Sequence, residues 1–265
     1  MRRLGYYLRL VGGQLRMSVL AALQYRLGFW TQGVLGILWS ALGMAPLLVA
    51  ATRLDSVAGW TPGELLLLTG CFMTIMGLWS ALLGPALTAS MNHIRRGTLD
   101  YVLLRPADAL VLCLVTEFAP WSLIEALGGV LLIVGALVEL GRMPGALELA
   151  AALGLGLAGL LALYALGVLV LCASFRAMQL QNLTFLMEAV LDFGRWPAQV
   201  FRGALRVVFT YVVPLAVMTT YPAQALLGRL DGATVFAALG TSVGLMLVAR
   251  LLWLRALRGY SSASS

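Results

Sequence analysis

The sequence predicts an all-α polytopic membrane protein with six transmembrane helices, and its composition and its long apolar runs carry that prediction. Of the 265 residues, 61% are hydrophobic and only 11% are charged, and the mean hydropathy is +0.94. A soluble domain usually carries about 25% charged residues. Several apolar runs reach the roughly 20 residues that a helix needs to cross the hydrocarbon core. We therefore expect a single transmembrane domain over residues 1–265.

The first 16 residues predict an amphipathic helix that lies in the membrane interface. Apolar side chains recur at three- and four-residue spacing, and arginines recur every seven residues on the opposite face. A basic helix of this kind rests among anionic headgroups instead of crossing the bilayer. The apolar face consists of Leu4, Leu8, Val11 and Leu15, and the basic face of Arg2, Arg9 and Arg16.

The first two predicted spans cover about residues 27–51 and 61–90. The second begins with Thr61-Pro62-Gly63-Glu64, in which threonine suits the N-cap, proline the first helical position and glutamate the capping box. Near its far end, Gly84-Pro85 predicts a kink.

The remaining apolar runs predict four more spans and one irregular segment. Residues 196–230 are apolar but interrupted by prolines, so we expect an external re-entrant hairpin whose backbone is shielded by protein. The fifth span is short for a full crossing. The four spans cover about residues 109–138 (with Pro120 inside), 147–173, 180–193 and 233–254.

The arginine distribution predicts the orientation. Arginine accumulates in cytoplasmic loops, and both ends of the chain are arginine-rich, so both termini are expected in the cytoplasm and the number of crossings should be even. Six crossings place twelve arginines inside and six outside. The external cluster at Arg195, Arg202 and Arg206 fits this orientation least well.

Composition and motifs argue against other classes of protein. All 18 basic residues are arginines, scattered between apolar runs, which is typical of topology signals and not of a nucleic-acid-binding patch. Without lysine, the chain cannot contain a Walker A phosphate loop. The cysteines Cys71, Cys113 and Cys172 lie within apolar runs and are expected to be buried without binding a metal. With one histidine, His93, and neither HExxH nor GxSxG, the sequence does not predict an enzyme.

Charge and apolar residues are mixed in the largest predicted cytoplasmic loop, residues 91–108. Its stretch RRGTLDYVLLRP, residues 95–106, reads as a short helix stopped by Pro106. The stretch could lie against lipid headgroups, or its apolar side chains could form a docking surface for a cytoplasmic partner.

Ionisable residues within predicted spans are candidates for a substrate path or gate, because charge is costly inside a membrane. A buried network that fixes packing is the alternative interpretation. Asp192 and Arg195 are spaced to form an ion pair. The candidate path residues are Glu117, Trp121 and Glu125 in the third span, and Glu188, Asp192 and Arg195 on one face of the fifth. The external hairpin carries Arg202, Arg206, Pro214 and Pro222, either as a gate or as a headgroup anchor.

Three segments resemble the permease subunits of bacterial type-2 ABC exporters. They are the GTLDYVLLRP part of the loop, residues 97–106, the segment from RWPAQVF to YPAQALLG, residues 195–228, and the weaker tail LRGYSSAS, residues 257–264. The resemblance implies six spans, an interfacial N-terminal helix and an external hairpin. It also implies that the loop couples ATP hydrolysis to transport, through Arg95, Arg96, Gly97, Leu99, Asp100, Tyr101, Leu103, Leu104, Arg105 and Pro106.

The same resemblance implies the partners. ATP and magnesium would be bound by a separate cytoplasmic ATPase and not by this chain, which would need no cofactor of its own. A second permease, more often a paralogue than a second copy, would complete the path in the bacterial inner membrane, and a hydrophobic or amphipathic substrate would move outward by alternating access. From the residues alone, an ATP-independent channel or ion-coupled carrier and a membrane enzyme acting on lipid remain alternatives.

Overall fold

The computed structural model describes residues 2–24, 26–53, 56–104, 107–114, 117–175, 183–209 and 213–258. Within these ranges the chain is helical and contains no β-strand beyond an isolated bridge between Val57 and Trp60. The longer helices are α1 (Arg2–Gln24), α2 (Arg26–Arg53), α3 (Pro62–Leu78), α4 (Gly84–Arg95), α7 (Leu123–Glu139), α8 (Ala146–Ser174) and α12 (Gly232–Arg258).

Short helical segments connect the long ones. The α-helical segments are α5 (Asp100–Leu103), α6 (Ala109–Leu114), α9 (Leu183–Leu191), α10 (Ala204–Val207) and α11 (Tyr221–Leu226). Single turns of 3₁₀ helix are η2 (Pro120–Ser122), η3 (Asp192–Arg195) and η4 (Ala198–Val200), and π turns are η1 (Trp79–Leu83) and η6 (Ala216–Thr220).

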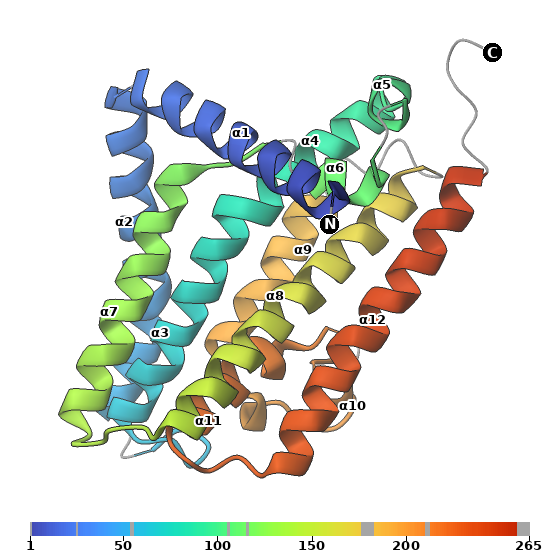
Figure 1. Ribbon diagram of the computed structural model, residues 1–265. Coiled ribbons are helices and arrows are strands. Elements are labelled where there is room, and N and C mark those ends of the chain that lie inside the picture. The colour runs from blue at the N-terminus through green and yellow to red at the C-terminus, as the bar shows by residue number, and fades with distance from the viewer. Residues whose placement is uncertain are drawn as a thin grey trace.

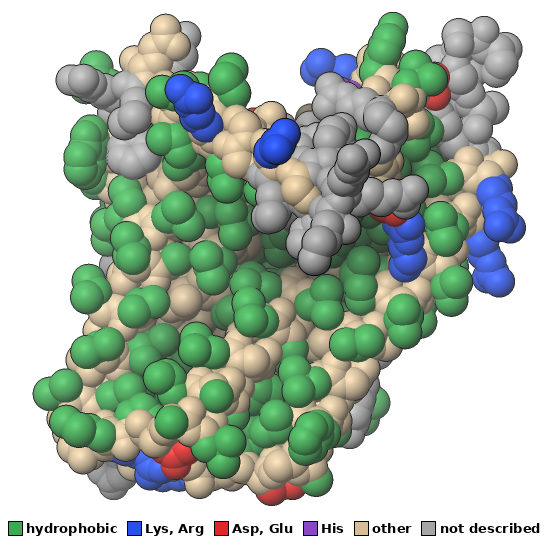
Figure 2. Space-filling model, in the orientation of Figure 1, with side chains coloured by type: hydrophobic (Ala, Val, Ile, Leu, Met, Phe, Trp, Pro, Cys, Tyr) green, Lys and Arg blue, Asp and Glu red, His purple; other side chains and the backbone are tan. Residues whose placement is uncertain are grey.

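The long helices run side by side, and α1 lies obliquely across one set of their ends (Figure 1). That end, here termed the α5 end, also carries α5 and the C-terminal end of α12, while α11 lies toward the opposite, α11 end. Figure 2 shows charged side chains gathered at the two ends of this face and hydrophobic side chains between them. This distribution is the one that a bilayer requires.

Four helical stretches in the described part of the chain are long and apolar enough to cross a membrane: Pro62–Arg95, Pro120–Glu139, Ala146–Ser174 and Gly232–Arg258. They fall on the second, third, fourth and last predicted spans. Helix α2, with 28 residues, occupies the position of the first. Helix α9 has nine residues and covers only about 14 Å, roughly half of the hydrocarbon core. The count of six crossings therefore stays a prediction.

The N-terminal helix is longer than the sequence predicted. Helix α1 reaches Gln24, whereas the heptad spacing of arginines indicated an end near residue 16. The added residues 17–24 are MSVLAALQ, and their alanine, leucine, methionine and glutamine residues favour helix strongly.

The kink predicted near Pro85 takes the form of a π turn, η1, between α3 and α4. Proline has no backbone N–H, so Pro85 cannot bond to the carbonyl of Ala81 four residues earlier. That carbonyl instead accepts the backbone N–H of Ala119 at 2.9 Å.

Ala119 belongs to a second break, which divides the predicted third span. Residues 109–138 form not one helix but α6 and, after η2, α7. Ala119 has φ −116° and ψ 81°, outside the helical region, because the residue before a proline is sterically disfavoured there. The interpretation of residues 109–138 as one crossing with an internal Pro120 was therefore wrong. The helical stretch that is long and apolar enough to cross a membrane starts at Pro120.

Helices α3 and α7 approach closely through small residues. A Cβ added to Gly77 would lie 2.4 Å from the backbone nitrogen of Ala126, and one added to Gly129 would lie 2.5 Å from the backbone nitrogen of Thr74. Because lipid tails are as apolar as leucine, such close backbone approach is a main source of helix association in membranes.

Replacing Gly77 with valine should therefore weaken the fold. We expect the free energy of unfolding to fall by about 1–3 kcal/mol, the usual cost of overfilling a well-packed interface. Thermal unfolding in mild detergent would measure the loss. Gly135→Val on α7 is the matched control, because a Cβ at Gly135 meets nothing within 4 Å. Equal unfolding temperatures for the two variants would contradict the close-packing argument.

Candidate functional site

The predicted coupling loop is a helical projection built from α4, α5 and α6 (Figure 1). Helix α4 ends at Arg95, and Gly97 just beyond it has a φ of +67°, a left-handed conformation that glycine adopts without strain. The Gly97 N–H donates to the carbonyl of Ile94 at 3.1 Å, and the Thr98 N–H donates to that of His93 at 2.9 Å. These two bonds form a Schellman motif, which turns the chain sharply into α5.

Helix α5 has one buried side and one exposed side. Leu99, just before it, is fully buried, and Val102 packs beside it. Tyr101 is 73% exposed and Leu104 81% exposed. The predicted short helix is thus present, and its apolar residues divide into an anchor in the protein and a surface facing outward.

The outward surface is also basic at its edge. Arg95 and Arg96 at the end of α4 are exposed, Leu103 is partly exposed, and Asp100 is half-buried. We name Arg95, Arg96, Tyr101, Leu103 and Leu104 the α5 surface. The predicted coupling residues Arg105 and Pro106 lie outside the described residues.

Asp108 ties this projection to the last long helix. Its carboxylate accepts two bonds from the Arg250 guanidinium of α12, one of 2.8 Å from Nη1 to Oδ1 and one from Nη2 to Oδ2. It also accepts the backbone N–H of Leu110 at 3.0 Å, at the start of α6. The bonded Arg250 holds the pKa of Asp108 below its usual range.

A second tie joins the projection to α8. The Tyr164 hydroxyl donates to the carbonyl of Leu110 at 3.1 Å, and Leu87 of α4 packs against Gly167. Sequence reasoning assigned no role to Asp108, Tyr164 or Arg250. Asp108 stands just before α6, where an acidic residue favours a helix start, but its partner lies 142 residues away.

The candidate path residues of the third span do not share a helix. Glu117 is exposed and precedes α7, Trp121 is half-buried in η2, and Glu125 is half-buried in the first turn of α7. Since η2 also contacts α1, these residues lie toward the α5 end. Placing Glu117 in the same continuous span as Trp121 and Glu125 was wrong, because the chain breaks before Pro120, whereas the other two lie together in the stretch Pro120–Glu139.

The ion pair predicted in the fifth span is confirmed. Arg195 Nη2 lies 2.9 Å from Asp192 Oδ1, in the 3₁₀ turn η3 that follows α9, and Glu188 is exposed one turn earlier. The Arg195 guanidinium also lies 5.2 Å from the centre of the Phe72 ring, within cation–π range. Its Nη1 lies 1.4 Å from where a Cβ would stand on Gly43 of α2, so a larger residue at this position would require the Arg195 side chain to move.

The predicted hairpin, residues 196–230, begins and ends at the α11 end. Near its start, Trp60 Nε1 donates to Gln199 Oε1 at 3.3 Å, and at its close Arg229 forms an ion pair with Glu64. Between them the segment reaches inward to Met218, which packs against Gly159 of α8. The described parts of this segment thus begin and end at the α11 end and pack inside the bundle between these points.

The two prolines named in the hairpin lie inside the protein. Pro214 and Pro222 are buried, whereas Arg202 is exposed. The side chain of Arg206 lies outside the described part of the structure. Among the described residues no group of three or more histidine, cysteine, aspartate or glutamate side chains is placed to hold a metal ion.

Replacing Asp108 with asparagine should lower stability by about 1 kcal/mol, since both partners of the Arg250 pair are partly exposed. A carboxylate whose folded pKa is depressed stabilises the protein above its unfolded pKa of about 3.9, and that contribution is lost as the pH falls through the folded value. The difference in unfolding temperature between wild type and Asp108→Asn should therefore be largest above about pH 5 and shrink below about pH 4.

The matched control is Arg255→Gln, an exposed arginine on the same helix, which should show no such pH dependence. If Asp108→Asn lowered the unfolding temperature by the same amount at low and neutral pH, the stabilising role of the ion pair would be refuted.

Comparison with known proteins agrees with this arrangement. A family model described as ABC-2 family transporter protein matches residues 37–264, so the match includes the α5 projection and the hairpin. No curated protein and no solved structure gives a match to the chain. Because the family model extends over most of the chain, from α2 onward, the chain belongs to the ABC-2 transporter family and is a type-2 ABC permease.

Proposed function

We propose that this chain is the transmembrane permease subunit of an ATP-driven exporter, and that its separate ATPase docks on the α5 surface. The observation that carries the proposal is the division of α5. Tyr101 and Leu104 are exposed beyond 70% while the adjacent Leu99 is fully buried. Exposed apolar groups held on a rigidly anchored helix are typical of protein interfaces. ATP and magnesium would be bound by the partner.

Force applied at the α5 surface would reach the transmembrane helices through the two ties beneath it. Leu99 packs in the same buried cluster as Leu171 of α8 and Trp253 of α12. The Asp108–Arg250 pair leads to α12, and the Tyr164–Leu110 bond leads to α8. A rigid displacement of α5 and α6 would therefore shift α8 and α12, the motion that alternating access requires.

We propose a topology of six crossings with the α5 end in the cytoplasm of a bacterial inner membrane. The arginines of α1, of the α5 surface and of the C-terminal end of α12 support this orientation by the positive-inside rule. Three of the arginines toward the other side are paired with acids: Arg142 with Glu148, Arg195 with Asp192, and Arg229 with Glu64. This pairing reduces the net positive charge that the α11 end presents.

A second permease, a paralogue in our proposal, would pair with this chain to enclose the path of a hydrophobic or amphipathic substrate. Broad apolar faces support the need for further neighbours in the membrane: Trp30 and Trp39 on α2 and Phe236 on α12 are more than 60% exposed. Exposed Glu188 and Glu117 would contribute acidic groups to the path, which favours substrates with a cationic part, and the Asp192–Arg195 pair would add a polar but neutral group.

The direct test is to co-express the chain with the proteins encoded beside its gene and purify it in mild detergent. Recovery of an ATPase and a second permease in fixed stoichiometry would establish the assembly. If the chain is recovered alone while the neighbours are present, and transports in vesicles without ATP, it is a channel or an ion-coupled carrier instead.

Replacing Leu104 with glutamate should uncouple the exporter without unfolding it. The new charge would be placed in the interface with the ATPase, and a misplaced interfacial charge costs on the order of 1–3 kcal/mol, so ATP-dependent transport in proteoliposomes should fall about tenfold or more. The unfolding temperature should not change, because Leu104 is exposed in this chain.

Met143→Glu provides the matched control, since Met143 is 97% exposed and lies in the turn between α7 and α8. Normal transport by Leu104→Glu together with its ATPase would remove the α5 surface from the coupling path.

A further inference from the structure

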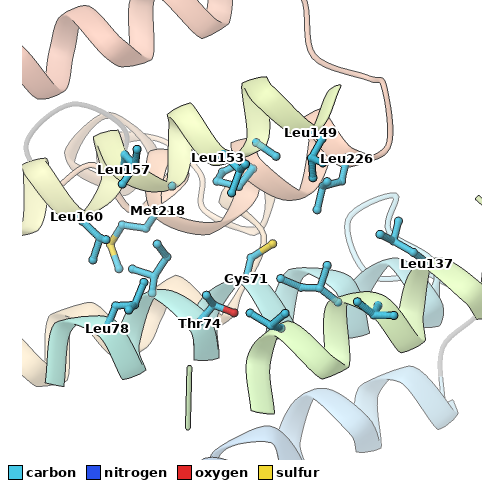
Figure 3. A pocket seen from close by; sticks show the side chains of 17 residues that line it. Cys71, Thr74, Leu78, Leu137, Leu149, Leu153, Leu157, Leu160, Met218 and Leu226 are labelled. Atoms are coloured by element: carbon cyan, nitrogen blue, oxygen red, sulfur yellow. The ribbon is translucent and has the colours of Figure 1, made fainter. Parts of the chain in front are cut away.

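An apolar groove runs along the molecule between α7 and α8. Helix α3 forms its floor, and η6 and α11 close it from behind. Figure 3 shows its elongated shape, with Leu78 and Leu160 near one end and Leu137 and Leu226 near the other. The groove has a volume of about 340 Å³, within the range of small-molecule sites.

The groove occupies one half of the membrane thickness. Its lining on α8 extends from Leu149, near the start of that helix, to Leu160, a rise of about 16 Å, or roughly half of the hydrocarbon core. Because α8 starts at the α11 end, the groove belongs to the leaflet on that side.

The lining offers a guest no strong hydrogen-bond partner. Among the lining residues only Thr74 carries a hydroxyl, and that hydroxyl donates to the carbonyl of Gly70 in its own helix at 2.8 Å. A polar guest would lose its hydration without compensation. The groove therefore suits an unbranched alkyl chain.

The walls of the groove carry apolar side chains that are exposed in this chain. Val130 and Val134 on α7 are 44% and 53% exposed, and Leu153 and Leu157 on α8 are 63% and 68% exposed. All four lie on stretches that qualify as membrane spans. A lipid chain can thus enter sideways from the bilayer.

A cationic side chain stands at the α11 end of the groove. Arg142 Nε donates to the carbonyl of Leu226, which lines the groove, at 3.1 Å. Its Nη2 donates to Glu148, the residue before the lining Leu149, at 3.0 Å. The Arg142 side chain remains 39% exposed, so its planar fork of donors can also meet a phosphate.

We propose that the groove is a phospholipid site, which holds an acyl chain between α7 and α8 and the phosphate beside Arg142. The guest comes from the bilayer itself, in the leaflet at the α11 end. The proposal requires only that the chain spans a membrane, and not that an ATPase docks on the α5 surface.

The test uses the full chain, purified with any subunits that remain bound. It is placed in nanodiscs of phosphatidylethanolamine and phosphatidylglycerol that contain a little phosphatidylglycerol with a diazirine on its acyl chain. After photolysis, mass spectrometry maps the labelled residues. We expect labels concentrated on residues 130–137 of α7 and 149–160 of α8.

Gly156→Phe should fill the groove, because Gly156 lines it and a Cβ there meets Ile75 at an ordinary 3.8 Å. If the new side chain excludes even two methylenes of the lipid acyl chain, binding should weaken about tenfold. Labelling by the photoreactive lipid should therefore fall about tenfold. Gly156→Leu should give a smaller loss if the phenylalanine variant unfolds. Gly154→Phe is the control on the same helix, since a Cβ at Gly154 meets nothing within 4 Å, and it should label as wild type does.

Even labelling over α2, α7, α8 and α12 that Gly156→Phe leaves unchanged would overturn the proposal, because it would indicate ordinary surrounding lipid. Efficient disulfide formation between subunits carrying Leu153→Cys would overturn it too, because the groove would then be covered by protein.

Discussion

The fold depends on one constraint: backbone groups within the hydrocarbon must find partners inside the protein. The helices satisfy most of these groups through their own hydrogen bonds, so the constraint bears mainly on the backbone groups at the helix breaks. At Pro85 the carbonyl of Ala81 is left without its helical donor, and the break before Pro120 supplies the N–H of Ala119. A backbone donor at one helix break thus bonds to the unpaired acceptor at another break that lies far away in the sequence.

The hairpin meets the same constraint with side chains. The Thr219 hydroxyl donates to the carbonyl of Gly194 at 2.9 Å, and the Thr220 hydroxyl accepts the backbone N–H of Ala198 at 3.1 Å. Both threonines are fully buried. They lie in the π turn η6, which packs against α3 and α8, so the irregular backbone of the hairpin is shielded from lipid by protein.

Features set by neighbouring residues were predictable from the sequence, whereas those set by distant residues were not. The helix start at Thr61, where the backbone N–H donates to Glu64 at 3.0 Å, and the Asp192–Arg195 pair follow from spacing alone. The membrane class and the short helix at residues 100–103 follow from composition and pattern. Pro120 was wrongly placed inside one continuous span, because the bond from the Ala119 N–H to the Ala81 carbonyl, which compensates for the break, joins residues far apart in the sequence.

The ties around the candidate site were beyond sequence reasoning for the same reason. Asp108 and Arg250 stand 142 residues apart, and Glu64 and Arg229 stand 165 apart. No periodicity connects them, and each residue alone resembles an ordinary helix-end charge. Only the arrangement of the helices makes them partners, as it does for Arg195 against Gly43.

The contact between α1 and η2 has a consequence for biosynthesis. The ribosome completes α1 roughly a hundred residues before it completes residues 120–122, which at about 5–20 residues per second is a delay of about 5–20 seconds. During that interval α1 can rest on the membrane surface and on α2, which it also contacts. The exposed Arg9 and Arg16 favour anionic headgroups, so the surface can retain α1 until the second of the four membrane-spanning candidates, Pro120–Glu139, is made and brings η2 to the helix.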